Sequence, residues 1–299
     1  MLLQQLINGL TLGSVYALIA LGYTMVYGII ELINFAHGEI YMIGAYMGIV
    51  ALAAAAALGL SEVSAALTLL GVFGAAMLYC GAYGVTMERV AYRPLRQAPR
   101  LSPLISALGM SIFLQNYVML AQGARDKAFP ALIGGGFEVG PARVTAIQLF
   151  IMATSLLLMF LLHTFVRRTR LGKAMRATAQ DRRMAALVGI NVDQIISVTF
   201  LIGSLLAGAA GVMVALYYGL VNFFIGYVAG IKAFTAAVLG GIGNIPGAML
   251  GGLLLGLIES FGAGYISAEY KDVFAFAILV LVLIFRPAGL LGEQVPQRA

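Results

Sequence analysis

VDQIISVTFLIGSLLAGAAGVMVALYY, residues 192–218, carries a single charged side chain and is long enough to cross a bilayer as one helix. About 20 helical residues cover the roughly 30 Å of hydrocarbon. Seven further apolar segments flank it, near 3–29, 38–59, 64–86, 102–121, 147–165, 229–263 and 272–286. None shows the period-two alternation of a membrane β-barrel. The sequence therefore predicts an all-α fold of about eight transmembrane helices, forming a single transmembrane domain over residues 1–299.

The composition of the chain excludes a soluble enzyme. Of its 299 residues, 62% are hydrophobic and 10% are charged. Soluble domains have roughly 45–50% apolar and about 25% charged residues. The sequence has no phosphate-binding loop, no His-Glu-x-x-His motif and only one cysteine, Cys80. We therefore expect no catalytic group, cofactor or metal in this chain.

The basic residues indicate which loops face the cytoplasm. Eleven of the 18 Lys and Arg residues lie in two loops, 88–103 (which includes Arg100) and 166–190. Short loops rich in Lys and Arg stay in the cytoplasm, so loop 122–146 between them is predicted outside. Basic loops that set the membrane topology account for the net charge of +6. We therefore expect no nucleic acid partner. The first basic residue is Arg89, so we expect no cleavable signal peptide, and the orientations of the termini stay open.

Loop 166–190 has the pattern of a short amphipathic helix. Apolar residues recur at helical spacing, Lys173, Arg176 and Arg183 occupy another face, and Gly189 can end the segment. Two interpretations remain open from these residues alone. The segment is either a basic loop that sets orientation and touches anionic lipid, or a docking helix for a cytoplasmic partner.

A polar stretch at 31–39 interrupts the apolar sequence with Glu31, Asn34, His37 and Glu39. One interpretation is local, with Asn34 and Glu39 satisfying free backbone groups at a helix end. The other is that these groups line a translocation path, because ionisable groups within lipid are candidates for functional sites. Both interpretations remain open.

The segment 229–263 is expected to be interrupted near the midplane. Residues 240–247 are too rich in glycine, with Pro246, to form a continuous helix. Broken helices expose backbone dipoles and can line a water-filled cavity, here with Lys232, Asn244 and Glu259 as polar residues. Lys232 opposite Glu259 would be tolerated in a protein interior, while the glycines are expected to pack helices closely.

Four stretches of the chain resemble a known family. They are GIIELINFAHGEI at 28–40, ERVAYRPLR at 88–96, DRRMAALVGIN at 181–191 and FTAAVLGGIGNIPGA at 234–248. All are similar to the permease subunit of bacterial high-affinity branched-chain amino acid ABC transporters, the LivH/BraD type. The resemblance runs from Met1 to about Gly292.

The resemblance implies a multi-pass permease of the bacterial inner membrane that forms half of a pore with a second, related permease subunit. Two cytoplasmic ABC ATPase subunits would supply the energy from ATP and Mg²⁺. A periplasmic branched-chain amino acid binding protein would deliver leucine, isoleucine or valine. A passive passage needs few specificity residues if the binding protein provides the selectivity.

The resemblance also favours the docking interpretation of loop 166–190. Permeases of this kind insert a short cytoplasmic helix into a groove on the ATPase, and Met184 stands where the usual motif has Glu. The docking residues so implied are Lys173, Arg176, Arg182, Arg183, Ala186 and Gly189.

The main alternative is an ion-coupled secondary amino acid transporter, with Glu31, Glu39 or Glu259 as the ion site. It predicts uptake by this chain alone, without ATP.

We also expect Glu259→Ala to impair transport more than Glu62→Ala, because Glu62 begins a span at the surface.

Overall fold

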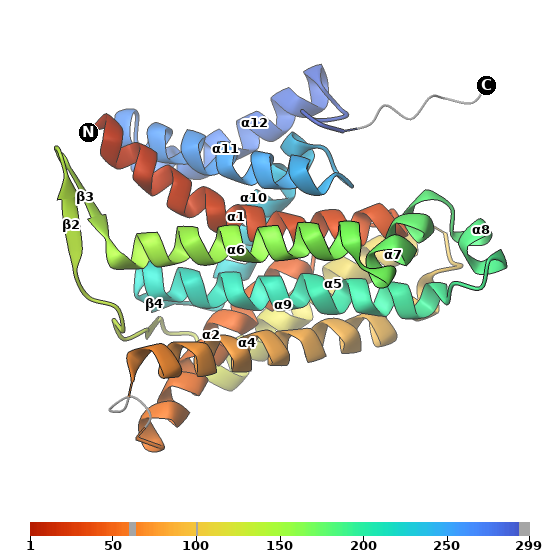
Figure 1. Cartoon of the computed structure of the whole chain (residues 1–299), viewed down its shortest axis with the longest axis horizontal. Coiled ribbons are helices and arrows are strands. Elements are labelled where there is room, and N and C mark those ends of the chain that lie inside the picture. Colours follow the sequence, from red (N-terminus) through yellow and green to blue (C-terminus); the bar gives the residue numbers. More distant parts are fainter. Residues whose placement is uncertain (60–63, 100, 293–299) are drawn as a thin grey trace.

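The computed structural model describes residues 1–59, 64–99 and 101–292, so Glu62 and Arg100 lie outside the described residues. The described chain contains eleven α-helices (Figure 1). They are α1 (Leu2–Ile30), α2 (His37–Ala57), α4 (Ala65–Met87), α5 (Leu101–Gln122), α6 (Ala146–Arg168), α7 (Arg170–Gln180), α8 (Arg182–Leu187), α9 (Val192–Tyr218), α10 (Ile225–Gly240), α11 (Ile245–Tyr265) and α12 (Lys271–Phe285).

This architecture confirms the all-α prediction. Seven helices are long and apolar enough to cross a membrane, and α10 is a shorter apolar helix. The predicted interruption of 229–263 separates α10 from α11 at residues 241–244. Gly241 and Gly243 in this connection have φ values of 106° and 93°, which no helix permits.

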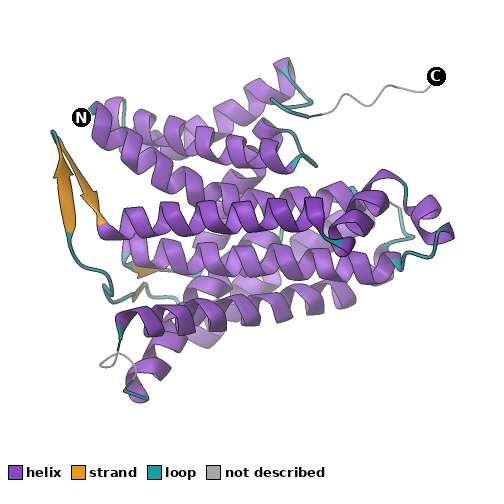
Figure 2. Cartoon of the chain, viewed as in Figure 1, coloured by secondary structure: helices purple, strands orange, loops and turns teal. Residues whose placement is uncertain are grey.

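Two small sheets were not predicted from the sequence (Figure 2). Strands β2 (Gly136–Val139) and β3 (Ala142–Thr145) form an antiparallel hairpin, and β1 (Lys127–Ala128) pairs with β4 (Leu220–Val221). Strands this short carry too few residues for a periodic signal, and the second pair joins segments far apart in the chain.

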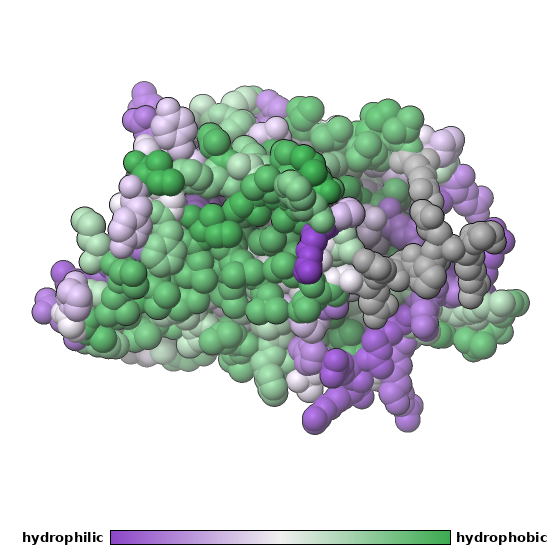
Figure 3. All heavy atoms as spheres, turned by 90° about the horizontal axis from the view of Figure 1, so that it is seen from above, coloured by the Kyte–Doolittle hydropathy of each residue, from purple (hydrophilic) through white to green (hydrophobic). Residues whose placement is uncertain are grey.

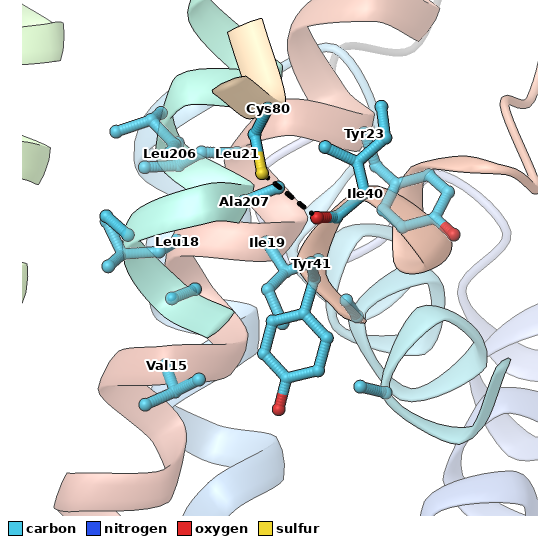
Figure 4. Close-up of a cluster of buried hydrophobic side chains, with 14 of the residues drawn as sticks. Val15, Leu18, Ile19, Leu21, Tyr23, Ile40, Tyr41, Cys80, Leu206 and Ala207 are labelled. Atoms are coloured by element: carbon cyan, nitrogen blue, oxygen red, sulfur yellow. Dashed lines mark hydrogen bonds between the residues drawn. The ribbon is translucent and has the colours of Figure 1, made fainter. Parts of the chain in front are cut away.

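Helices α1 and α9 form the centre of the molecule, and most of their side chains are buried. Figure 4 shows side chains of α1 and α9 packed with Ile40 and Tyr41 of α2 and with Cys80 of α4. The Cys80 thiol is fully buried and donates a hydrogen bond to the Ile40 carbonyl, 3.3 Å away. Away from this centre, α5 and α6 expose large apolar side chains, as lipid-facing helices do.

Glycines allow α1 and α11 to pack with their backbones in contact. A Cβ added at Gly9 or Gly13 would lie 2.8 Å from the Cα of Leu257 or Leu253, and Gly252 and Gly256 face α1 from the other side. Such close approach is how small residues join membrane helices. The packing role expected for Gly252 and Gly256 is therefore confirmed, while Gly9 and Gly13 were not predicted.

The two ends of the molecule differ in character. The amide of Gln4, at the start of α1, donates to the carbonyl of Arg143 in β3, so this terminus lies beside the β2–β3 hairpin. Helices α7 and α8 lie at the opposite end (Figure 1). The view from above shows apolar atoms over most of the surface, with hydrophilic residues mainly toward the ends (Figure 3). The predicted cytoplasmic location of loop 166–190 would place the start of α1 on the outer side.

Candidate functional site

The predicted docking loop folds as a hairpin of two helices, α7 and α8, outside the membrane spans. Thr169 caps α7 by accepting from the Gly172 amide at 3.0 Å. Asp181 caps α8 by accepting from the amides of Arg183 and Met184 at 2.8 and 3.0 Å. Gly189 follows α8 with a φ of 86°, a conformation that favours glycine, and turns the chain toward α9.

Only part of the predicted docking set is free on the surface of this hairpin. Arg176 donates to the carbonyl of Val166 in α6, and Arg182 donates to the carbonyl of Ile29 in α1 at 2.8 Å. These two arginines therefore attach the hairpin to its own bundle. The remaining members, Lys173, Arg183, Ala186 and Gly189, are exposed.

Sequence reasoning missed an apolar surface on the same hairpin. Met184, Leu187 and Val188, here called the apolar tip, have 62%, 80% and 76% of their surfaces exposed. The signal was present in the sequence, because 184–188 is an apolar stretch far too short to span a membrane within a basic loop. Exposed apolar groups outside the membrane spans are candidates for an interaction surface.

The polar stretch at 31–39 divides into one exposed and three buried groups. Asn34 accepts a 2.7 Å hydrogen bond from the Tyr92 hydroxyl, and Glu39 accepts one of 3.0 Å from Ser111. The His37 ring lies edge-on to Tyr23, with 5.0 Å between ring centroids. Glu31 is exposed and lies apart from them, at the end of α1.

Each of the three buried groups keeps an unused polar atom. Asn34 Nδ2, His37 Nε2 and Glu39 Oε2 have no hydrogen-bond partner within the described ranges. Buried polar atoms are nearly always paired with protein or ordered water, so these three atoms are candidates for bonds to water or to a ligand.

Two helices begin inside the membrane beside Glu39. Ser111, its hydrogen-bond partner, lies at the middle of α5, which places the carboxylate near midplane depth. Helix α2 begins at His37, and Gly226 in the first turn of α10 backs directly onto Glu39. Helix N-termini carry partial positive charge, so this carboxylate lies between two favourable dipoles. The α10–α11 connection lies instead at the basic end, beside Gly28.

The structure brings Lys232 and Glu259 together, as the sequence suggested. Lys232 Nζ lies 2.7 Å from Glu259 Oε1 and 2.6 Å from Asp272 Oδ1. The Tyr16 hydroxyl donates to Glu259 at 2.9 Å. This cluster joins α1, α10, α11 and α12, and Asp272 was not predicted because nothing in its local sequence relates it to Lys232.

Asn244 has a local role that its position explains. Its side-chain oxygen accepts from the Gly247 amide at 3.0 Å and so caps α11, while its amide donates to the Leu291 carbonyl at 2.8 Å. It also lines a cavity at the basic end together with Glu31 and Arg176.

The chain is a polytopic helical bundle with polar groups at helix ends in its interior and a two-helix hairpin at its basic end, an architecture that suits a membrane transport permease. Residues 5–283 match the family of branched-chain amino acid transport system permease components. The chain belongs to this family, and it is the non-catalytic, multi-pass permease component of a bacterial branched-chain amino acid ABC transport system.

Individual relatives agree over nearly the full chain. The chain is 56% identical to the high-affinity branched-chain amino acid transport system permease protein BraD of Pseudomonas aeruginosa, covering 97% of this chain and 96% of that protein. It is 53% identical to LivH of Escherichia coli over the same shares. A probable LivH of Methanocaldococcus jannaschii is 25% identical over 93% of this chain and 89% of that protein.

Proposed function

We propose that this chain forms one half of a pore that imports leucine, isoleucine and valine across the bacterial inner membrane. A second related permease subunit forms the other half, and a periplasmic binding protein delivers the amino acid. Two cytoplasmic ABC ATPase subunits, which use ATP and Mg²⁺, drive the cycle. The α7–α8 hairpin carries this proposal, because it is a capped motif that presents an apolar surface at the basic end.

The apolar tip is the part of the hairpin that enters the ATPase. Met184, Leu187 and Val188 would bury apolar surface worth roughly 1.5–3 kcal/mol per fully buried side chain. The small residues Ala186 and Gly189 permit close approach, and Lys173 and Arg183 lie at the rim. Arg176 and Arg182 act as braces, because their guanidinium groups already bond the bundle.

Arg176 and Arg182 connect the hairpin to the membrane-spanning helices, so that movement of the hairpin can reach them. Movement of α7 and α8 reaches α6 through Arg176 and α1 through Arg182, while α8 continues into α9. In the first turn of α9, Asp193 pairs with Arg93 at 2.9 Å and with Arg96. Arg96 also pairs with the buried Glu88, so the motion extends to α4 as a rigid-body shift.

The polar groups at the start of α2 serve the passage of the amino acid. An apolar side chain crosses an apolar passage readily, but its ammonium and carboxylate groups need polar partners or water. Asn34, His37 and Glu39 offer unpaired atoms at this depth. In the Lys232–Glu259–Asp272 cluster, the ammonium group is paired with carboxylates of the protein, and these ion pairs hold α10, α11 and α12 together.

Leu187→Asp tests the docking surface. A carboxylate on the apolar tip would have to be desolvated in the interface, so the ATPase subunits should no longer co-purify with the permease, while membrane insertion stays normal. Phe137→Asp, at an exposed apolar residue of β2 on the opposite end, is the matched control and should retain the ATPases. ATPase subunits that co-purify normally with Leu187→Asp would remove the tip from the interface.

A further inference from the structure

A cavity of about 500 Å³ opens at the basic end, where α1, α6, α7 and the α10–α11 connection meet. Small-molecule sites typically measure about 300–1,000 Å³. Neither the apolar tip nor the buried groups at the start of α2 line this cavity. Its charges are arranged with opposite signs on different elements.

One wall is positive. Arg167 and Arg176 line it, and the Arg167 side chain has no hydrogen bond or ion pair within the part of the chain that the structure describes. Arg176 is held in place by its bond to Val166, which leaves other N–H groups free. Ile245 and Pro246, the first residues of α11, add the positive end of a helix dipole. This wall suits a carboxylate.

The other wall is negative. It consists of Tyr27, Gly28 and Glu31 at the carboxyl end of α1, where the Glu31 carboxylate and the negative end of the helix dipole favour a cation. The Glu31 backbone has a φ of 53°, the one positive value of a non-glycine residue among those described. Glycine would adopt this conformation more easily, so a glutamate here indicates a task for its carboxylate.

The nearest arginines do not neutralise Glu31. Arg96 and Arg182 line a neighbouring cavity of about 170 Å³ together with Glu31. Arg182 donates to the Ile29 carbonyl, and Arg96 pairs with Glu88 and Asp193. Glu31 itself forms no ion pair within the described ranges, so its charge is available to a ligand.

An apolar recess lies next to the two charged walls. This space of about 70 Å³ shares Gly28, Val166 and Arg176 with the main cavity, and its further lining of Met25, Ile29 and Met175 is apolar. The cavity therefore combines an anion site, a cation site and an aliphatic recess, which are the three features of an apolar amino acid.

We propose that this cavity binds a free branched-chain amino acid from the cytoplasmic side. Its carboxylate lies on Arg167 and Arg176, its ammonium group on Glu31 and the end of α1, and its side chain in the recess. The assignment rests on the proposed function, which supplies the identity of the amino acid. Because the ligand would join α6 and α7 to α1, a bound amino acid would hold the docking hairpin against the bundle. The fraction of occupied sites would therefore rise with the concentration of imported amino acid in the cytoplasm.

Equilibrium binding of tritiated leucine tests this site in the assembled transporter in nanodiscs, without ATP and without the binding protein. Arg167→Gln and Glu31→Gly should each weaken leucine binding about tenfold or more, since each removes a charge-assisted contact. Arg168→Gln is the matched control, because Arg168 is exposed on the same helix turn and does not line the cavity. It should change binding less than twofold. Glu31→Gly should keep or raise the thermal midpoint, because it relieves the backbone.

Analogues identify the chemistry that is recognised. Isocaproate lacks the ammonium group, isoamylamine lacks the carboxylate and alanine lacks the branched side chain, so each should compete at least tenfold less well than leucine. Isocaproate that competes equally would overturn the assignment, as would leucine binding that survives both cavity variants or falls equally in Arg168→Gln. ATP-driven uptake is measured separately, with the same purified transporter in sealed proteoliposomes that also receive the binding protein. Absent uptake would refute the proposed function, whereas normal uptake without this binding would refute only the cavity site.

Discussion

Lys232 shows how one residue shapes the interior of the bundle. Its ammonium group is buried and shared between Glu259 inside the protein and Asp272, whose side chain is 41% exposed. A buried ion pair adds little net stability over apolar residues, but an isolated buried charge is costly. The cluster should therefore tolerate joint replacement better than single replacement.

Lys232→Met tests this account of the cluster. Removing the cation leaves Glu259 buried without its partner, so the free energy of unfolding should fall by about 3–5 kcal/mol. The double variant Lys232→Met/Glu259→Leu should recover much of this loss, and Asp272→Asn should have a smaller effect because Asp272 is partly solvated. Unfolding in detergent measures all three. A double variant as unstable as the single one would contradict the account.

For single residues, the sequence indicated which polar groups lie in the interior better than it indicated which partners they contact. The Lys232–Glu259 pair was suggested because a lysine is tolerated in a protein interior opposite a carboxylate. Asp272 was missed because its contact depends on how α12 packs. The bonds of Arg176 and Arg182 to backbone carbonyls were missed for the same reason, since a carbonyl partner leaves no mark in the sequence.

The contact between α1 and α11 requires glycine where the two helix backbones touch. Gly256 faces the backbone of Gly13, so no side-chain movement can make room for a Cβ. The closeness of these helices thus depends on glycine at the seam.

Gly256→Val tests the seam. Forcing the helices apart should lower the free energy of unfolding by about 1–3 kcal/mol or more, and should reduce the folded yield. Gly71→Val is the matched control, because a Cβ at Gly71 meets nothing within 4 Å, and it should change stability by less than about 0.5 kcal/mol. Both are compared by thermal unfolding in detergent. Equal stability of the two variants would mean that the seam can open without cost.

Helices were predictable from the sequence where the local composition alone determines that they form or end. All eight apolar segments appear as helices, and the glycines with Pro246 ended α10 within the predicted stretch. The depth at which α2 and α10 begin beside Glu39 was not predictable, because it depends on how the helices pack against one another. The β1–β4 pair likewise depends on contacts between distant segments.

The predicted orientation of the whole molecule can be tested with Cys80 and two introduced cysteines. Cys80 is fully buried, so a membrane-impermeant maleimide should not label the native protein. In membranes without the ATPase subunits, Leu187→Cys should be labelled only from the cytoplasmic side and Phe137→Cys only from the outside. Labelling in right-side-out and inside-out vesicles measures this. Rapid labelling of Cys80, or labelling of both variants from one side, would contradict the fold or its orientation.

Leucine uptake into sealed proteoliposomes tests the central claim most directly, namely that this chain conducts the amino acid while separate ATPases supply the work. Vesicles with both permease subunits, the ATPases, the binding protein and ATP should accumulate leucine, and Leu187→Asp should abolish accumulation. The purified chain alone, given a proton or sodium gradient and no ATP, should accumulate none. Accumulation by the chain alone under an ion gradient would contradict this account and identify an ion-coupled transporter.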